Sequence, residues 1–208
     1  MARYTDAVCR LCRRAGEKLF LKGERCLTPR CAIERRRRAP GEQSPRRRRV
    51  SDWGVHLREK QKARVTYGLL ERQFRRYFEQ AQKNPQATPE VLMQLLERRL
   101  DNVVYRLDFA ESRAQARQLV RHGHVTVGGR KVDIPSYRVK EGDVISWKAT
   151  SRDKEFVKAL AVGMPRKAVP GWLSMDATAL TGNVARLPNP GEIDTNIQAR
   201  LIVEFYSK

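Results

Sequence analysis

The sequence has few acidic residues and no long apolar run. Asp and Glu number 23 among 208 residues, against 43 Lys and Arg. No apolar stretch approaches the roughly 18 residues that a membrane-spanning helix needs, and the N-terminal segment lacks the apolar core of a secretory signal. We therefore expect a cytoplasmic protein with no membrane partner. Hydrophobic residues still make up 40% of the chain, which is enough for one or two compact domains with buried cores.

Motifs of the common catalytic sites are also missing. The sequence contains no phosphate-binding loop of the G-x4-G-K-[ST] type, no G-x-S-x-G turn and no H-E-x-x-H pair. Its acidic residues are scattered singly among basic neighbours. His122 and His124 form an H-x-H pair that could be metal ligands or a base, but His122 beside Arg121 at a helix C-terminus better suits a cation facing a phosphate. These absences favour a binding protein over an enzyme.

The positive charge is concentrated near the N-terminus. The formal net charge is +20, and residues 1–50 hold 16 basic and 5 acidic side chains, a surplus of 11. Of the 43 basic residues, 31 are arginines, whose planar guanidinium donates two parallel hydrogen bonds to one phosphate. Basic runs also occur in localisation signals, membrane-surface patches and solvated tails. Because the whole chain is basic and folded-looking segments follow the runs, a nucleic acid is the expected partner.

All four cysteines lie in one short segment. Cys9, Cys12, Cys26 and Cys31 follow the spacing C-x2-C-x13-C-x4-C, in which two close pairs can complete a tetrahedral four-sulfur shell. We expect a structural Zn²⁺ that stabilises a small, highly charged module and leaves no open position for catalysis. A [4Fe-4S] cluster on the same cysteines is the alternative, since spacing does not select the ion. Two disulfides or free thiols are the remaining interpretations.

Periodicity predicts a largely helical framework. Residues 32–50 are basic and turn-rich, which indicates an extended connector that becomes ordered on its partner. Apolar residues recur at three- and four-residue spacing over 51–83, which predicts two helices. A long helix is expected over 88–107 and a shorter one over 112–123. A closing helix is expected over 194–206, although Leu201, Ile202 and Val203 alone would also suit a strand.

After residue 123 the period of the sequence changes to two. Residues 124–132 predict a hairpin around a Gly-Gly turn, and residues 144–147 predict a further strand. Strand-like pieces recur around 172–173 and 184. The two helices and the small twisted sheet over 99–147 are expected to form one compact α+β unit.

Basic side chains on one face of the helix expected over 112–123 indicate an RNA-binding surface. Arg113, Arg117 and Arg121 recur at four-residue spacing, opposite the apolar Leu119 and Val120. Folded RNA suits such a surface better than duplex DNA, because RNA is recognised by shape, phosphates and 2′-hydroxyls. The residues expected to contact RNA are Arg35, Arg36, Arg37, Arg38, Arg46, Arg47, Arg48, Arg49, Arg58, Lys62, Arg72, Arg75, Arg76, Arg99, Arg113, Arg117, Arg121, His122, Arg130 and Lys131.

Residues 99–137, RLDNVVYRLDFAESRAQARQLVRHGHVTVGGRKVDIPSY, resemble the RNA-binding domain named after small-subunit ribosomal protein four. The start MARYTDAVCRLCRR, the segment SDWGVHLREKQKARVTYGLLERQFRRYF over 51–78 and the ending LIVEFYSK are similar to the bacterial members of that ribosomal family. The resemblance therefore covers essentially the whole chain. Pseudouridine synthases and tyrosyl-tRNA synthetases also carry the RNA-binding domain, but they need a separate catalytic domain for which this sequence has no signature.

The resemblance implies a structural constituent of the small ribosomal subunit that is not an enzyme. Members bind directly and early to a multi-helix junction of small-subunit (16S) ribosomal RNA and nucleate assembly of the subunit body. The resemblance also implies a contact with small-subunit ribosomal protein five and an influence on translational accuracy. It further implies a position where messenger RNA enters the subunit, with Arg46 and Arg49 lining the channel. The protein is expected to act there as a monomer.

Composition and the resemblance together divide the chain into three regions. Residues 1–50 form the four-cysteine module and its Arg-rich connector. Residues 51–97 form a helical RNA-binding domain that is completed by 192–208, and residues 98–191 form an inserted α+β RNA-binding domain. Many bacterial members of the family lack the four cysteines. The metal is therefore expected to stabilise the module locally rather than to serve the shared function.

Overall fold

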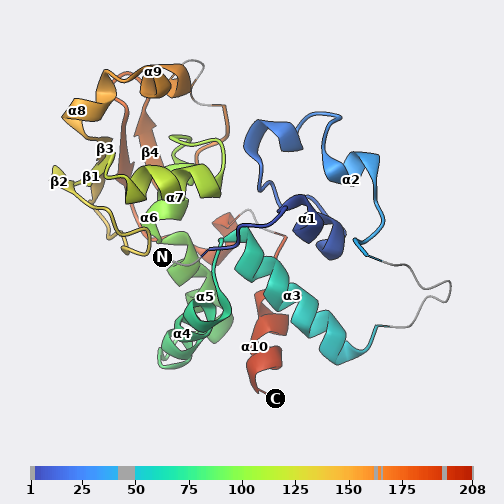
Figure 1. Ribbon diagram of the computed structural model, residues 1–208. Coiled ribbons are helices and arrows are strands. Elements are labelled where there is room, and N and C mark those ends of the chain that lie inside the picture. The colour runs from blue at the N-terminus through green and yellow to red at the C-terminus, as the bar shows by residue number, and fades with distance from the viewer. Residues whose placement is uncertain (1–2, 42–49, 162–163, 165, 194–195, 208) are drawn as a thin grey trace. The chain divides into compact units, whose positions relative to one another are not determined.

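The computed structural model describes residues 3–41, 50–161, 164, 166–193 and 196–207. The chain divides into two compact units, one made of Met1–Leu92 and Thr195–Lys208 and the other of Met93–Asp194. Ten α-helices and a single antiparallel sheet are described in these residues, which confirms a mixed α+β protein (Figure 1). No described helix is both long enough and apolar enough to cross a membrane.

The first unit begins with the cysteine-containing segment. Its short elements are α1 (Cys9–Ala15), the 3-10 turn η1 (Gly23–Cys26) and α2 (Ala32–Arg35). Helix α1 ends at Gly16, whose φ of 82° is left-handed and therefore favours glycine. Three of the cysteines and Leu19 are the buried apolar residues of this segment. The segment therefore has a very small core of its own.

The helices of the first unit are α3 (Asp52–Thr66), α4 (Glu71–Gln82), the start of α5 (Thr88–Glu97) and α10 (Ala199–Ser207). Helix α3 begins where the Ser51 hydroxyl accepts a hydrogen bond from the Gly54 amide at 3.3 Å, the usual N-cap arrangement. It ends before Gly68, whose φ is 63°. The two helices expected over 51–83 are thus present, and the closing helix expected over 194–206 is present from Ala199.

Helix α10 lies beside α3 although the two helices are far apart in sequence (Figure 1). The Glu59 carboxylate accepts a hydrogen bond from the Gln198 amide at 2.7 Å, just before α10 begins. The aromatic residues Phe74, Tyr77 and Phe78 of α4 are buried. They belong to the core of this unit, so they are not available to stack on bases.

The second unit continues α5 and adds α6 (Leu100–Arg106), α7 (Arg113–Arg121), α8 (Ala149–Arg152), α9 (Glu155–Ala161) and the 3-10 turn η2 (Pro190–Glu192). Its strands are β1 (Val125–Val127), β2 (Arg130–Lys131), β3 (Val144–Trp147), β4 (Leu173–Asp176) and β5 (Thr181–Val184). They pair in the order β2-β1-β3-β5-β4, and every pair is antiparallel. The strand-like pieces around 172–173 and 184 therefore extend the sheet that the hairpin begins.

Helices α6 and α7 pack against this sheet through one apolar core. The core joins Val103, Leu119 and Val120 of the helices to Ile145 and Trp147 of β3, all almost fully buried. The arrangement places Leu119 and Val120 inward and leaves the opposite side of α7 for polar residues. This is the orientation that the sequence predicted for α7.

The single helix expected over 88–107 is wrong, because the structure breaks it into α5 and α6. At the break, the Leu100 amide donates to the Tyr137 carbonyl at 2.9 Å, and the Val139 amide donates to the Arg98 carbonyl at 3.0 Å. Arg99 is extended, with a ψ of 134°, and forms an isolated bridge to Arg138. Tertiary hydrogen bonds to a distant segment thus replace the helical bonds that the apolar period implied.

The limits of the two units also differ from those expected. One limit falls after Leu92, inside α5, rather than after residue 97, and the other falls after Asp194 rather than after residue 191. The cysteine-containing segment belongs to the same unit as α3 and α4. Glu17 of that segment is ion-paired with Lys62 of α3 at 2.9 Å.

Candidate RNA-binding surface and cysteine cluster

The polar side of α7 presents two arginines whose positions are fixed by neighbouring residues. Ser112 caps the helix by accepting from the Gln115 amide at 3.3 Å. Arg113 donates from Nε to Asn102 Oδ1 at 2.8 Å, and its guanidinium lies 4.5 Å from the centre of the Tyr105 ring. Because stacking and a hydrogen bond already restrict this side chain, it loses less conformational entropy when it binds a ligand.

Glu97, at the end of α5, is the first of two buried carboxylates behind these arginines. It is fully buried and accepts hydrogen bonds from Asn102 Nδ2 at 2.7 Å and from Arg106 at 3.0 and 2.9 Å. Asn102 in turn orients Arg113. A chain of charge-assisted hydrogen bonds therefore runs from the interior of the unit to the surface of α7.

Asp101 is the second buried carboxylate. It accepts from Arg99 Nε at 3.0 Å and from Arg99 Nη2 at 2.6 Å, which is the bidentate geometry of a strong ion pair. Its Oδ2 also accepts from Arg117 Nη1 at 3.1 Å. One carboxylate thus holds the fully buried Arg99 guanidinium together with that of Arg117, whose side chain is 15% exposed.

The prediction that Arg99 contacts RNA is wrong for this structure, because the side chain is 0% exposed. Its guanidinium lies inside the unit against Asp101, where a phosphate could not reach it without unfolding the α5–α6 junction. Arginine is almost never fully buried unless it is paired, so the sequence pattern suggested an exposed side chain for Arg99. The pairing partner stands two residues further on, in the RLD motif.

The end of α7 and the hairpin carry exposed basic groups. Arg121, His122, Arg130 and Lys131 are all exposed. His124 is different: its Nδ1 lies 3.0 Å from the Ser151 hydroxyl, and burial together with nearby cations lowers its pKa. Among the described residues no group of His, Cys, Asp or Glu has the arrangement of a metal site, so the H-x-H pair is not assembled as one.

In the first unit, most of the predicted RNA-binding residues are exposed, namely Arg35, Arg36, Arg37, Arg38, Arg58, Arg72, Arg75 and Arg76. Arg46, Arg47, Arg48 and Arg49 lie outside the described residues. Lys62 is the exception, because its side chain is only 13% exposed and pairs with Glu17 at 2.9 Å and Glu59 at 3.0 Å. Burial favours the neutral amine, but the two carboxylates outweigh it and raise the pKa of Lys62. Its charge is already neutralised within the protein.

The four cysteines converge on one small pocket between α1, η1 and α2. Cys12, Cys26 and Cys31 are buried, and Cys9 is partly exposed. All four are free thiols, which disagrees with the disulfide interpretation. Burial and the proximity of the other cysteines raise the pKa values of Cys12 and Cys26. All four cysteines thus line one pocket, but the described residues contain no group arranged as a metal site.

Comparison with known proteins assigns the chain to a family. Residues 3–97 match the family described as "Ribosomal protein S4/S9 N-terminal domain", and residues 98–145 match the "S4 domain". The small ribosomal subunit protein uS4A of Symbiobacterium thermophilum is 58% identical over 208 residues, which is the full length of both chains. The uS4 proteins of Pelotomaculum thermopropionicum and Acetivibrio thermocellus are 56% and 57% identical over full length. The chain belongs to the uS4 family of ribosomal proteins.

Membership in the uS4 family confirms the resemblance found in the sequence. The two matched regions together run from residue 3 to residue 145, and the relatives extend the similarity to the C-terminus. The uS4 proteins are structural ribosomal proteins and not enzymes, which agrees with the missing catalytic motifs. The surface of α7 lies in the segment that matches the S4 domain.

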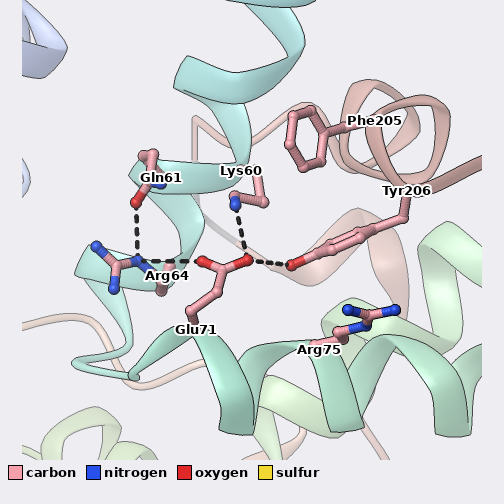
Figure 2. Close-up of a pocket in the computed structure, with 7 residues that line it drawn as sticks. All are labelled: Lys60, Gln61, Arg64, Glu71, Arg75, Phe205 and Tyr206. Carbon is pink, nitrogen blue, oxygen red and sulfur yellow. Dashed lines mark hydrogen bonds and ion pairs between the residues drawn. The ribbon is translucent and has the colours of Figure 1, made fainter. Parts of the chain in front are cut away.

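Sequence reasoning missed one group of neighbouring residues in the first unit. Lys60 and Arg64 of α3 and Tyr206 of α10 surround the carboxylate of Glu71 from α4, with Phe205 beside Lys60, and with Arg64 on the opposite side of Glu71 from Tyr206 (Figure 2). The spacing of Lys60 and Arg64 by four residues places them on one helix face. Nothing local shows that the aromatic pair near the C-terminus lies beside them, because that proximity depends on the packing of α10 against α3.

Proposed function

We propose that this protein is a structural constituent of the small ribosomal subunit in the cytoplasm, where it binds ribosomal RNA directly. The observation that carries the proposal is the surface of α7, where Arg113 and Arg117 are held by buried partners in the segment that matches the S4 domain. Preorganised guanidinium groups suit the fixed phosphates of a folded RNA. The net charge of +20 supplies long-range attraction to the same polyanion.

The finer role that we propose is recognition of a multi-helix junction of the small-subunit RNA and nucleation of the subunit body. A basic surface on each of the two units supports it, because a junction offers several phosphate backbones at once. We also propose a contact with small-subunit ribosomal protein five, an effect on translational accuracy and a position beside incoming messenger RNA at Arg46 and Arg49. The contact with protein five, the effect on accuracy and the position beside messenger RNA rest on the family alone. We propose that the protein acts as a monomer within the ribosome.

A titration against naked small-subunit ribosomal RNA tests the proposal, with excess transfer RNA as competitor and a series of salt concentrations. We expect tight binding that the competitor does not displace. Because each phosphate contact releases counterions, a fourfold rise in salt should weaken binding by about three decades or more if several phosphates are engaged. Equal displacement by any RNA, or a shallow salt dependence, would contradict the proposal.

We propose further that Cys9, Cys12, Cys26 and Cys31 hold a structural metal. Their convergence on one pocket supports this, and four thiol donors match a closed tetrahedral zinc shell. A [4Fe-4S] cluster on the same thiolates is the second candidate. A bound cation would stabilise the thiolate forms, which otherwise repel one another in a half-buried site, and would compensate for the small core of this segment.

Changing Cys9 to serine tests the metal proposal. We expect the purified variant to lose the metal and to unfold in its cysteine-containing segment, while the helices over 52–207 remain folded. Elemental analysis identifies the metal, and visible absorption distinguishes an iron–sulfur cluster from zinc. Unchanged metal content together with an unchanged circular dichroism spectrum would contradict the proposal.

A further inference from the structure

Lys60, Arg64, Phe205 and Tyr206, together with the predicted RNA contact Arg75, line an open pocket of about 590 Å³ in the first unit. It is lined from three helices, by Lys60, Gln61 and Arg64 of α3, Glu71 and Arg75 of α4, and Phe205 and Tyr206 of α10 (Figure 2). This volume lies in the usual range of small-molecule sites. Three cationic side chains, one carboxylate and two aromatic rings give it a local surplus of two positive charges.

Glu71 organises the floor of the pocket. Its Oε1 accepts hydrogen bonds from Lys60 Nζ at 2.7 Å and from the Tyr206 hydroxyl at 2.8 Å. Lys60 is only 5% exposed, and its ammonium lies 4.6 Å from the centre of the Phe205 ring. The Lys60 charge is thus compensated internally, and the orientation of Tyr206 is fixed.

The two arginines at the rim of the pocket have hydrogen-bond donors that the described part of the protein leaves unused, unlike Lys60. Arg64 donates from Nε to Gln61 at 2.8 Å, and the same atom lies 3.8 Å from Glu71. The terminal nitrogens of Arg64 have no hydrogen-bond partner among the residues that the structure describes. The Arg75 side chain is 68% exposed, and among the described residues its one ion pair is with Glu79 at 3.3 Å. Both guanidinium groups can therefore bind an anion with donors that the protein does not use.

The aromatic groups stand beside these cations. Tyr206 stacks on Phe78 with ring centres 4.6 Å apart, and Phe205 meets Tyr206 edge-on at 5.3 Å. Both Phe205 and Tyr206 remain partly exposed. Figure 2 shows the Arg75 guanidinium next to the Tyr206 ring, with Phe205 on the other side of the pocket. An anion-binding rim next to exposed aromatic surface suits a ligand that is both negatively charged and planar.

We propose that this pocket binds one unpaired nucleotide of RNA, with its two flanking phosphates on Arg64 and Arg75, one on each, and its base against Phe205. Unpaired bases of RNA commonly stack on aromatic side chains while basic groups hold the backbone. An acidic peptide would satisfy the two arginines but would leave the aromatic surface exposed. The inference rests on the proposed function, because it assigns to the same RNA a second contact in the helical unit.

Binding to small-subunit ribosomal RNA tests the pocket when wild type is compared with Arg64→Gln, Arg75→Gln and Phe205→Leu. Each arginine change should reduce the slope of log affinity against log salt by about 0.7 to 0.9, the value of one phosphate contact. Phe205→Leu should weaken binding about five- to a hundredfold with the slope unchanged, because it removes stacking and no charge. Thermal melting of each variant confirms that the fold is retained.

Arg200→Gln and Lys83→Gln are the matched controls. Arg200 lies on α10 and Lys83 follows α4, both are exposed, and neither lines the pocket. We expect both variants to bind as wild type does. Substituting 4-thiouridine for uridine in the RNA and irradiating the complex should also give a cross-link in the peptide that contains Phe205 and Tyr206.

The outcomes separate the pocket from the proposed function. If wild type fails to bind ribosomal RNA selectively, the proposed function fails and the pocket proposal fails with it. If wild type binds tightly but the three pocket variants bind like the controls, only the pocket proposal is overturned. A polyglutamate peptide that binds with the same dependence on Arg64, without any RNA cross-link at Phe205, would assign the pocket to a protein partner and would also overturn it.

Discussion

Replacing Asp101 by asparagine removes one negative charge from the interior of the second unit while almost preserving the shape of the side chain. Asp101 is 4% exposed and accepts two hydrogen bonds from the fully buried Arg99. It accepts another from Arg117 at 3.1 Å. Asparagine keeps one carbonyl acceptor, but it cannot compensate a buried guanidinium.

The expected cost is large for a single isosteric change. Removing one partner of a buried ion pair destabilises proteins by about 3 to 5 kcal/mol, because the remaining charge stays in the interior. The amide oxygen of asparagine recovers part of the hydrogen bonding, so we expect about 3 kcal/mol. In a unit of about 100 residues this corresponds to a fall in Tm of roughly 12 to 24 °C.

Thermal unfolding followed by circular dichroism measures the effect. Asp133→Asn is the control, since Asp133 is 48% exposed and lies 3.9 Å from Lys131; exposed pairs of this kind contribute about 0 to 1 kcal/mol. A loss of less than about 1 kcal/mol in Asp101→Asn would refute the argument. It would mean that Arg99 is compensated by other groups or reaches water when Asp101 is changed.

Three further predictions concern the RNA surface, acid stability and core packing. Arg113→Ala and Arg117→Ala should each weaken RNA binding with the fold retained, and unchanged affinity in both variants would remove the α7 face from the interface. Burial alone would raise the pKa of Glu71, but its hydrogen bonds to Lys60 and Tyr206 lower the pKa overall. The stability that the ionised Glu71 contributes is therefore complete above about pH 4.5 and is lost as pH falls through the folded-state pKa. The difference in Tm between wild type and Glu71→Gln should therefore shrink on acidification below pH ~4.5; a constant difference would show that the charge of Glu71 is not involved. A Cβ at Gly182 would collide with the Leu107 side chain, so Gly182→Ala should cost about 1 to 3 kcal/mol in chemical denaturation, whereas wild-type stability would mean that Leu107 moves aside freely.

Features set by neighbouring residues were the ones that the sequence predicted well. Ser51 and Ser112 cap helices at the expected positions, because an N-cap depends only on the next three residues. The apolar side of α7 and the hairpin before β3 follow from local periodicity in the same way. The four cysteines line one pocket, as short loops between close pairs allow, whereas the metal that their spacing predicts stays a prediction.

Features that depend on distant segments could not be predicted in this way. The break between α5 and α6 arises from hydrogen bonds to the distant residues Tyr137 and Val139, which an apolar period does not reveal. The burial of Arg99 depends on this break, which places its guanidinium against the buried carboxylate of Asp101. Tyr206 reaches Glu71 across 135 residues of sequence. In each example the deciding contact is tertiary, so the local pattern was compatible with more than one outcome.

The smallest strand of the sheet affects how the protein behaves before it meets its RNA. Strand β2 lies at one edge, is only two residues long, and exposes both Arg130 and Lys131. An open edge strand invites pairing with another chain, and short length and positive charge both oppose such pairing. Two copies meeting edge to edge would bring four cations together, and the exposed Lys131–Asp133 pair at 3.9 Å would offset only part of that repulsion. The groups expected to attract RNA therefore also help to keep the free protein from aggregating.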